Sequence, residues 1–128
     1  MSIGMSEELI VIITGARDYK NRWKLHTILD SLAPFRVVEG NCPTGADAFA
    51  RQWLLLQGIP TRSYTADWNR YGLGAGNIRN GVMLRAYCRR PNVLVAAFPT
   101  VNSTGTIDCV NQARALGMLV ENYGDIEV

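Results

Sequence analysis

The fold is decided by the stretch Leu9-Ile-Val-Ile-Ile-Thr14, which stops at Gly15. A continuous run of β-branched and aliphatic residues is typical of a strand buried on both faces, as in parallel sheets covered by helices. The glycine that follows permits a tight turn and a close approach of another backbone. The segment therefore predicts the central strand of a parallel sheet, with a turn at its carboxyl end.

Apolar runs and amphipathic patterns alternate after this strand. Further strands are predicted at residues 35–38, 60–64, 92–98 and 118–121, and helices at about 21–32, 45–57, 77–90 and 106–116. This order predicts an α/β fold, a three-layer Rossmann-like domain with a parallel sheet of about five strands and helices on both faces. Residues 65–76 show no periodicity and are predicted to form a long functional or mobile loop.

The chain has 128 residues, enough for one domain with its own apolar core. Residues 9–128 are expected to form that domain, and residues 1–8 a disordered N-terminal leader. No apolar run approaches the roughly 20 residues that a membrane-spanning helix needs. The N-terminus also lacks the basic and apolar regions of a signal peptide, so no membrane partner is expected.

The three cysteines, Cys42, Cys88 and Cys109, include no C-x-x-C pair and fit neither a disulfide framework nor a zinc site. Reduced thiols of this kind predict a cytoplasmic protein. The single histidine, His26, lies on a predicted helix away from the loop edge of the sheet. Neither a G-x-S-x-G elbow nor a P-loop occurs, so the sequence predicts no cofactor and no metal.

Charge is unevenly distributed, although the net charge is only +2. No Asp or Glu lies between Trp68 and Ile107, a stretch that contains five arginines. One interpretation is a solvated basic helix face. The other is that some of these arginines contact the oxygens of an anionic ligand, which the planar guanidinium suits. The five are Arg70, Arg79, Arg85, Arg89 and Arg90.

Ligands of open α/β sheets bind at the carboxyl ends of the strands, where helix N-termini attract anions. Three glycine-bearing loops are predicted at this edge. Each loop also has a purely structural interpretation: a turn with a surface arginine after the first strand, an Asp N-cap after the second, and a Ser/Thr N-cap after the fourth. Trp68 would likewise either stack on a base or pack the long loop against the domain. Asp47 is equally suited to capping and to accepting from a ribose hydroxyl. The candidate ligand-binding residues are Gly15, Ala16, Arg17, Gly45, Asp47, Trp68, Arg79, Asn80, Ser103, Thr104, Gly105 and Thr106.

Four segments together resemble the YspA/YpsA-related branch of the SLOG superfamily, which also includes DprA/Smf proteins and LOG-type phosphoribohydrolases. They are Ile13-Thr-Gly-Ala-Arg-Asp-Tyr19, Thr44-Gly-Ala-Asp-Ala48, Ala75-Gly-Asn-Ile-Arg-Asn80 and Ser103-Thr-Gly-Thr-Ile-Asp108. The resemblance runs from about residue 10 to residue 120. It implies a Rossmann-like fold that binds a nucleotide-type small molecule, and it implies a homodimer.

Two elements are similar to motifs of the LOG enzymes. Arg79-Asn-Gly-Val-Met83 is similar to their R-K-x-x-M element, and Ser103–Thr106 to the phosphate-binding half of P-G-G-x-G-T-x-x-E. Cys109 occupies the position of that Glu, whereas Asp108 lies one residue earlier. One residue on a helix turns a side chain by about 100°, so the match implies phosphate binding more directly than hydrolysis.

Three functions remain open from the sequence. The first is a nucleotide-binding or sensing module without catalysis. The second is an N-glycosidase acting on nucleoside 5′-monophosphates, in which Asp108 or Asp47 supplies the carboxylate and Arg79 holds the phosphate. The third is single-stranded nucleic-acid binding through the arginine-rich stretch with Trp68 and Tyr71.

Overall fold

The computed structural model describes residues 8–128, and the expected leader at 1–8 lies almost wholly outside them. Five parallel strands form one sheet in the order β3-β2-β1-β4-β5, as the alternating pattern predicts. The strands are β1 (Ile10–Gly15), β2 (Arg36–Glu39), β3 (Thr61–Ser63), β4 (Val93–Phe98) and β5 (Leu119–Asn122). The helices are α2 (Arg22–Leu32), α3 (Gly45–Gln57), α4 (Trp68–Tyr71), the 3₁₀ turn η1 (Gly72–Gly74), α5 (Ala75–Arg85) and α6 (Thr104–Ala115).

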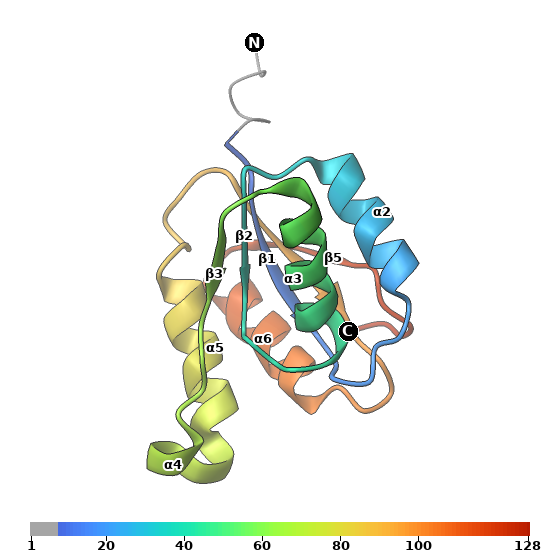
Figure 1. Ribbon diagram of the computed structural model, residues 1–128. Helices are drawn as coiled ribbons and strands as arrows, with labels where there is room; N and C mark the ends of the chain where they lie inside the picture. The colour runs from blue at the N-terminus through green and yellow to red at the C-terminus, as the bar shows by residue number, and fades with distance from the viewer. Residues whose placement is uncertain (1–7) are drawn as a thin grey trace.

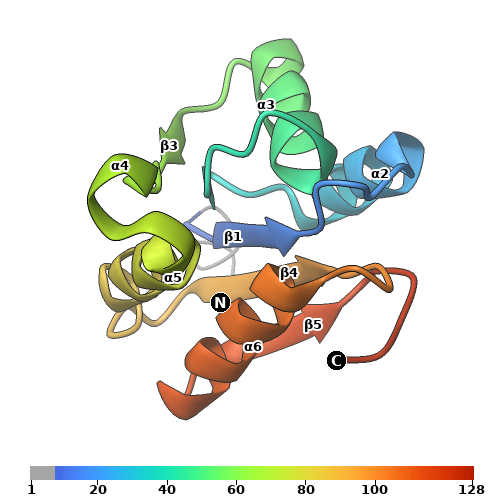
Figure 2. The ribbon, with the colours of Figure 1, turned by 90° about the horizontal axis from the view of Figure 1, so that it is seen from below.

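The sheet is sandwiched between two helical layers, which confirms the predicted three-layer α/β architecture (Figure 1). Helices α2 and α3 cover one face, and α5 and α6 cover the other, as the view along the sheet shows (Figure 2). Two apolar clusters fill the spaces between the layers. One joins β1 and β4 to α2 and α3, and the other joins them to α5 and α6.

Strand β1 is central because its side chains serve both clusters. Val11 and Ile13 pack toward α2 and α3, whereas Ile10 and Ile12 pack toward α5 and α6. Such alternation follows from the two-residue period of a strand. The chain passes from β1 to β2 and β3 on one side, then returns to add β4 and β5 on the other. The order reverses between β1 and β4, the place where α/β sheets bind ligands.

Two predictions about the segment before β4 are wrong. Residues 65–76 are not an irregular loop but contain α4 and η1, and the Asp67 side chain caps α4 by accepting from the Arg70 amide. Helix α5 ends at Arg85, although the sequence predicts helix to residue 90. After Arg85 the chain tightens into turns, with the Arg90 amide donating to the Tyr87 carbonyl. Pro91 disfavours helical geometry at Arg90, so it limits the turns that follow α5, whereas the helix itself already ends at Arg85.

No helix within residues 8–128 combines the length and apolarity that crossing a membrane requires.

The loop after β1 and the start of α3 lie in very close contact. Gly45 has a φ of +75°, and a Cβ atom there would overlap the Ala16 carbonyl oxygen. A Cβ on Gly15 would likewise overlap the Ala46 side chain. The Thr44 hydroxyl donates to the Arg17 carbonyl at 3.0 Å. Glycine is therefore required at Gly45 by both conformation and space.

We expect Gly45→Ala to lower the free energy of unfolding by at least about 3 kcal/mol, because left-handed strain of about 1–2 kcal/mol adds to the steric overlap. Gly58→Ala is the matched control, since Gly58 has a φ of +65° but open space around its Cβ position. That variant should lose only the strain contribution. Urea unfolding measures both changes, and equal losses would contradict the close contact.

Candidate functional site

A cavity of about 580 Å³ opens at the carboxyl edge of the sheet. This volume lies within the range of small-molecule sites. Its walls come from the loops after β1, β2 and β4, from the first turns of α3 and α6, and from α4, η1 and α5. The cavity therefore occupies the place at which the strand order reverses.

The structure brings together every predicted ligand-binding residue except Gly45. Gly45 does not line the cavity but packs beneath the backbone of Ala16 and Arg17. Asp108, a candidate catalytic residue, also lies outside the lining. Its Oδ2 accepts from Asn80 Nδ2 at 3.1 Å and from Gln112 Nε2 at 2.8 Å. The lining residues among those predicted are Gly15, Ala16, Arg17, Asp47, Trp68, Arg79, Asn80, Ser103, Thr104, Gly105 and Thr106.

The N-terminus of α6 presents unpaired amides to the cavity. Ser103 precedes the helix, but its hydroxyl oxygen accepts from the Thr100 amide instead of capping the helix. The first helical bond runs from Ile107 N to the Ser103 carbonyl. Among the described residues, none accepts from the amides of Thr104, Gly105 or Thr106. Such amides, together with the helix dipole, favour an anion.

Asp18 ties the loop after β1 to the loop after β4. Its Oδ1 accepts from the Thr100 hydroxyl at 2.6 Å, and its Oδ2 from Asn102 Nδ2 at 3.0 Å. These two hydrogen bonds, with Thr100 contributing most, hold the pKa of Asp18 below its ordinary value. Sequence analysis did not select Asp18, Thr100 or Asn102, although an aspartate three residues beyond the central strand was a usable signal.

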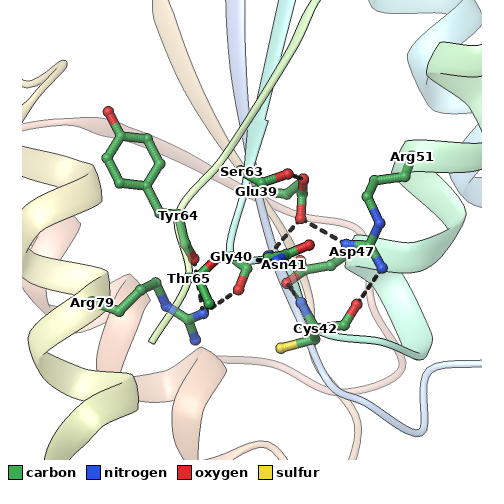
Figure 3. Close-up of polar contacts among 10 residues, drawn as sticks. All are labelled: Glu39, Gly40, Asn41, Cys42, Asp47, Arg51, Ser63, Tyr64, Thr65 and Arg79. Carbon is green, nitrogen blue, oxygen red and sulfur yellow. Dashed lines mark hydrogen bonds and ion pairs between the residues drawn. The ribbon is translucent and has the colours of Figure 1, made fainter. Parts of the chain in front are cut away.

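Arg79 fastens α5 to the ends of β2 and β3 (Figure 3). Its Nη1 donates to the Gly40 carbonyl and, at 3.4 Å, to the Tyr64 carbonyl. Its Nε donates to Asn80 Oδ1 at 2.9 Å. A Cβ on Gly40 would lie 2.6 Å from Nη1, so the glycine makes room for the guanidinium. Only Nη2 lacks a hydrogen-bond partner in the described part of the chain, and Arg79 is therefore chiefly a structural clamp.

Glu39, at the end of β2, is fully buried and serves the scaffold. Its Oε1 accepts from the Asn41 amide and lies 2.8 Å from Arg51 Nη1. Its Oε2 accepts from the Ser63 hydroxyl, so both oxygens are occupied (Figure 3). Glu39 does not line the cavity. The ion pair neutralises a carboxylate that would be costly to bury alone.

Asp47 is the buried carboxylate that does line the cavity. Its side chain belongs to the first turn of α3 and is only 4% exposed. Its Oδ2 accepts from the Cys42 amide at 3.1 Å. Burial raises the pKa of Asp47 to about 6, although the bond from Cys42 opposes the change. Burial and the adjacent Asp47 carboxylate also raise the pKa of the Cys42 thiol.

An aromatic side chain forms the outer rim of the cavity. Trp68 is 47% exposed, and the Arg17 guanidinium lies over its ring at 5.5 Å from the centroid. Leu73, which sequence analysis did not select, is fully exposed at the same rim. The rim therefore offers a flat apolar surface beside a cation. Within residues 8–128, no group of three or more His, Cys, Asp or Glu side chains is placed to hold a metal ion.

Comparison with known proteins gives two matches. A family model described as the YspA, cpYpsA-related SLOG family matches residues 9–71. The Gene 61 protein of Mycobacterium phage D29 is 35% identical over 128 aligned residues, which cover 90% of this chain and 96% of the phage protein. No solved structure matches the chain significantly.

We expect Arg79→Ala to lower the free energy of unfolding of the ligand-free protein by about 3 kcal/mol. The reason is that hydrogen bonds to charged groups contribute about 1.5–3 kcal/mol each, and their loss leaves the Gly40 and Tyr64 carbonyls without this donor. Arg85→Ala is the control, because Arg85 is an exposed arginine on the same helix whose side chain makes no hydrogen bond in the described chain. It should change stability by less than about 0.5 kcal/mol. Equal unfolding midpoints in urea would refute the clamp.

Asp47 should make the ligand-free protein less stable as pH rises from about 4 to 6. The unfolded chain releases this proton near 3.8, whereas the folded protein holds it to about 6, so folding is favoured below this window. The gap corresponds to about 3 kcal/mol. Asp47→Asn stays neutral and keeps an acceptor, so its advantage over the wild type should grow across this window and level off above it. Urea unfolding at several pH values tests this, and a constant difference between the two proteins would argue against a raised pKa.

Proposed function

This chain belongs to the YspA, cpYpsA-related SLOG family, and we propose on that basis that its cavity binds the phosphate of a nucleotide or nucleotide-derived ligand. The observation that carries the proposal is the uncapped first turn of α6 at the cavity wall. Ser103 turns its hydroxyl away toward Thr100, which leaves the helix amides for a ligand anion. The family resemblance supports a nucleotide-type ligand, and the unpaired amides explain why its phosphate would bind at the α6 N-terminus.

The cavity has suitable partners for the rest of such a ligand. Trp68 offers a ring face for a base, on which the Arg17 guanidinium rests at present. Arg17 also adds a positive charge to the cavity wall. A binding or sensing module needs no more than these contacts, and this is the function that the site supports best.

A second candidate is hydrolysis of the N-glycosidic bond of a nucleoside 5′-monophosphate. Asp47 favours it, because a cavity-lining carboxyl group with a pKa of about 6 is suited to general acid–base chemistry. Asp47 is better placed for this role than Asp108, whose Oδ2 is bound to Asn80 and Gln112. In this reading Arg79 offers the ligand only its Nη2.

A third candidate is single-stranded nucleic-acid binding. The side chains of Arg70, Arg85, Arg89 and Arg90 are exposed. Trp68 and Tyr71 of α4 are also partly exposed, the Arg70 guanidinium lies over the Tyr71 ring at 5.1 Å from its centroid, and basic groups beside aromatic rings suit single strands. Binding of this kind would weaken steeply with salt.

The test of the proposal is Gly105→Asp, which places a carboxylate at the α6 N-terminus. A Cβ on Gly105 meets no atom within 4 Å, and an acidic residue suits the first turn of a helix. The variant should therefore fold at least as stably as the wild type but repel phosphate. We expect thermal-shift screening with nucleoside mono-, di- and triphosphates, ADP-ribose and cyclic dinucleotides to show stabilisation by one class, about 2.7 kcal/mol at 100-fold the dissociation constant. That stabilisation should be lost in Gly105→Asp.

Gly105→Asn is the matched control, since it has the same shape without the charge. It should retain most of the stabilisation. Equal loss in both variants would point to a blocked cavity instead of a repelled anion. No stabilisation by any compound would overturn the proposal, and salt-dependent binding of single-stranded DNA by wild type and Gly105→Asp alike would favour the third candidate. Release of free base from a nucleoside 5′-monophosphate, abolished in Asp47→Asn, would favour the second.

A further inference from the structure

The cavity wall opposite the phosphate-binding amides contains a carboxylate with a free oxygen. In Rossmann-like domains an acidic side chain after the second strand commonly accepts hydrogen bonds from ribose. This chain has two acids in that region, Glu39 and Asp47. Glu39 is unsuited because both of its oxygens are bound within the protein and it lies outside the cavity lining.

Asp47, unlike Glu39, lines the cavity and has a carboxylate oxygen available to a ligand. The Cys42 amide donates to its Oδ2 at 3.1 Å, and the Cys42 thiol lies beside the same carboxylate. Within residues 8–128 no N–H donor reaches Oδ1, which leaves that oxygen to the cavity. The side chain is 4% exposed, and the cavity is the space that it borders. The Tyr19 hydroxyl is the one fully buried side-chain polar atom without a partner within residues 8–128, so Oδ1 of Asp47 is accessible from the cavity. A donor placed there would stabilise the carboxylate, which is largely removed from water. A ligand hydroxyl in the cavity would supply that donor.

Asp47 and the amides at the α6 N-terminus come from opposite faces of the sheet, so that one ligand in the cavity could contact both. Helix α3, which carries Asp47, lies on one face of the sheet, and α6 lies on the other (Figure 2). Their first turns both border the cavity, and the small residues Gly15 and Ala16 at the end of β1 lie between them. A ligand whose phosphate contacts α6 would extend its sugar across this edge toward α3.

We propose that Asp47 accepts hydrogen bonds from the hydroxyls of a ribose ring, so that the cavity selects ribonucleotides over 2′-deoxyribonucleotides. The inference rests on the proposed function, because it assumes that the phosphate occupies the α6 N-terminus. A carboxylate oxygen can receive the protons of both the 2′- and 3′-hydroxyls of a ribose diol. A 2′-deoxyribose loses one of these donors and leaves the buried carboxylate less well satisfied.

The test compares matched pairs of ribo- and 2′-deoxyribonucleoside 5′-monophosphates bearing each of the four bases, together with ribose 5-phosphate and 2-deoxyribose 5-phosphate. Binding is measured by calorimetry well above the Asp47 pKa of about 6, where the carboxylate is ionised. The wild type should bind the tightest ribonucleotide at least about tenfold more strongly than its deoxy partner, as the loss of one charge-assisted hydrogen bond predicts.

Two variants locate the discrimination at Asp47. Asp47→Ala should bring the ratio close to one, and Asp47→Asn should reduce it to about threefold or less, because a neutral hydrogen bond is weaker than a charged one. The Asn variant keeps an acceptor for the Cys42 amide, so it serves if the Ala variant unfolds. Binding of the deoxy compounds, which keep the 3′-hydroxyl, should weaken less than binding of the ribo compounds in both variants.

Each outcome has a distinct meaning. Binding that Gly105→Asp abolishes, but with equal affinity for ribo- and deoxyribonucleotides, would overturn this inference and leave the phosphate site intact. A tenfold preference that persists unchanged in Asp47→Ala would assign it to another residue and likewise overturn the inference. If none of these monophosphates binds, the inference fails, whereas the proposed function is decided by the wider screen of nucleotides.

Discussion

The contact between the backbone after β1 and the first residue of α3 determines where the groups of the site lie. Gly45 fits directly against the Ala16 carbonyl because it lacks a Cβ and adopts a positive φ. That contact brings the N-terminus of α3 to the end of the central strand and leaves Asp47, two residues later, at the cavity wall. With any larger residue at Gly45, the helix would have to move away and carry the carboxylate with it. Gly45 therefore shapes the cavity without being part of its lining.

Much of the fold follows from local patterns. The β-branched run of β1 and the apolar spacing of α2, α3 and α6 predict their elements within a few residues, since burial requires those periods. Helix α4 is missed because four residues are too few to show a period, although Asp67 carries a capping signal. Much of the cavity lining is also predictable, because the carboxyl ends of parallel strands meet at one edge. Hydrogen bonds between distant loops, such as that from the Thr100 hydroxyl to Asp18, could not be predicted, because they leave no local pattern in the sequence.

The structure gives a physical meaning to the position at which the sequence differs from the LOG motif that it resembles. Cys109 stands where the resemblance would place a glutamate, and its thiol is fully buried. Burial raises the pKa of Cys109 to about 11, so that the thiol stays protonated at neutral pH. Carboxylate chemistry is therefore absent at that position, and the cavity-lining carboxylates are instead Asp18 and Asp47. The first is fully engaged by Thr100 and Asn102, and the second keeps an open oxygen.

Many side chains of the site are held by main-chain atoms. Arg79 binds the Gly40 carbonyl, Asp47 the Cys42 amide, and Ser103 the Thr100 amide. Amides and carbonyls are unchanged by most substitutions, so a loop residue such as Cys42 can vary as long as the backbone path is kept, whereas Gly40 must also leave room for the Arg79 guanidinium. Such a site tolerates extensive divergence of its loops while its few anchoring side chains stay in register. A lineage can thus change the surface around the cavity, and with it the accepted ligand, without rebuilding the framework.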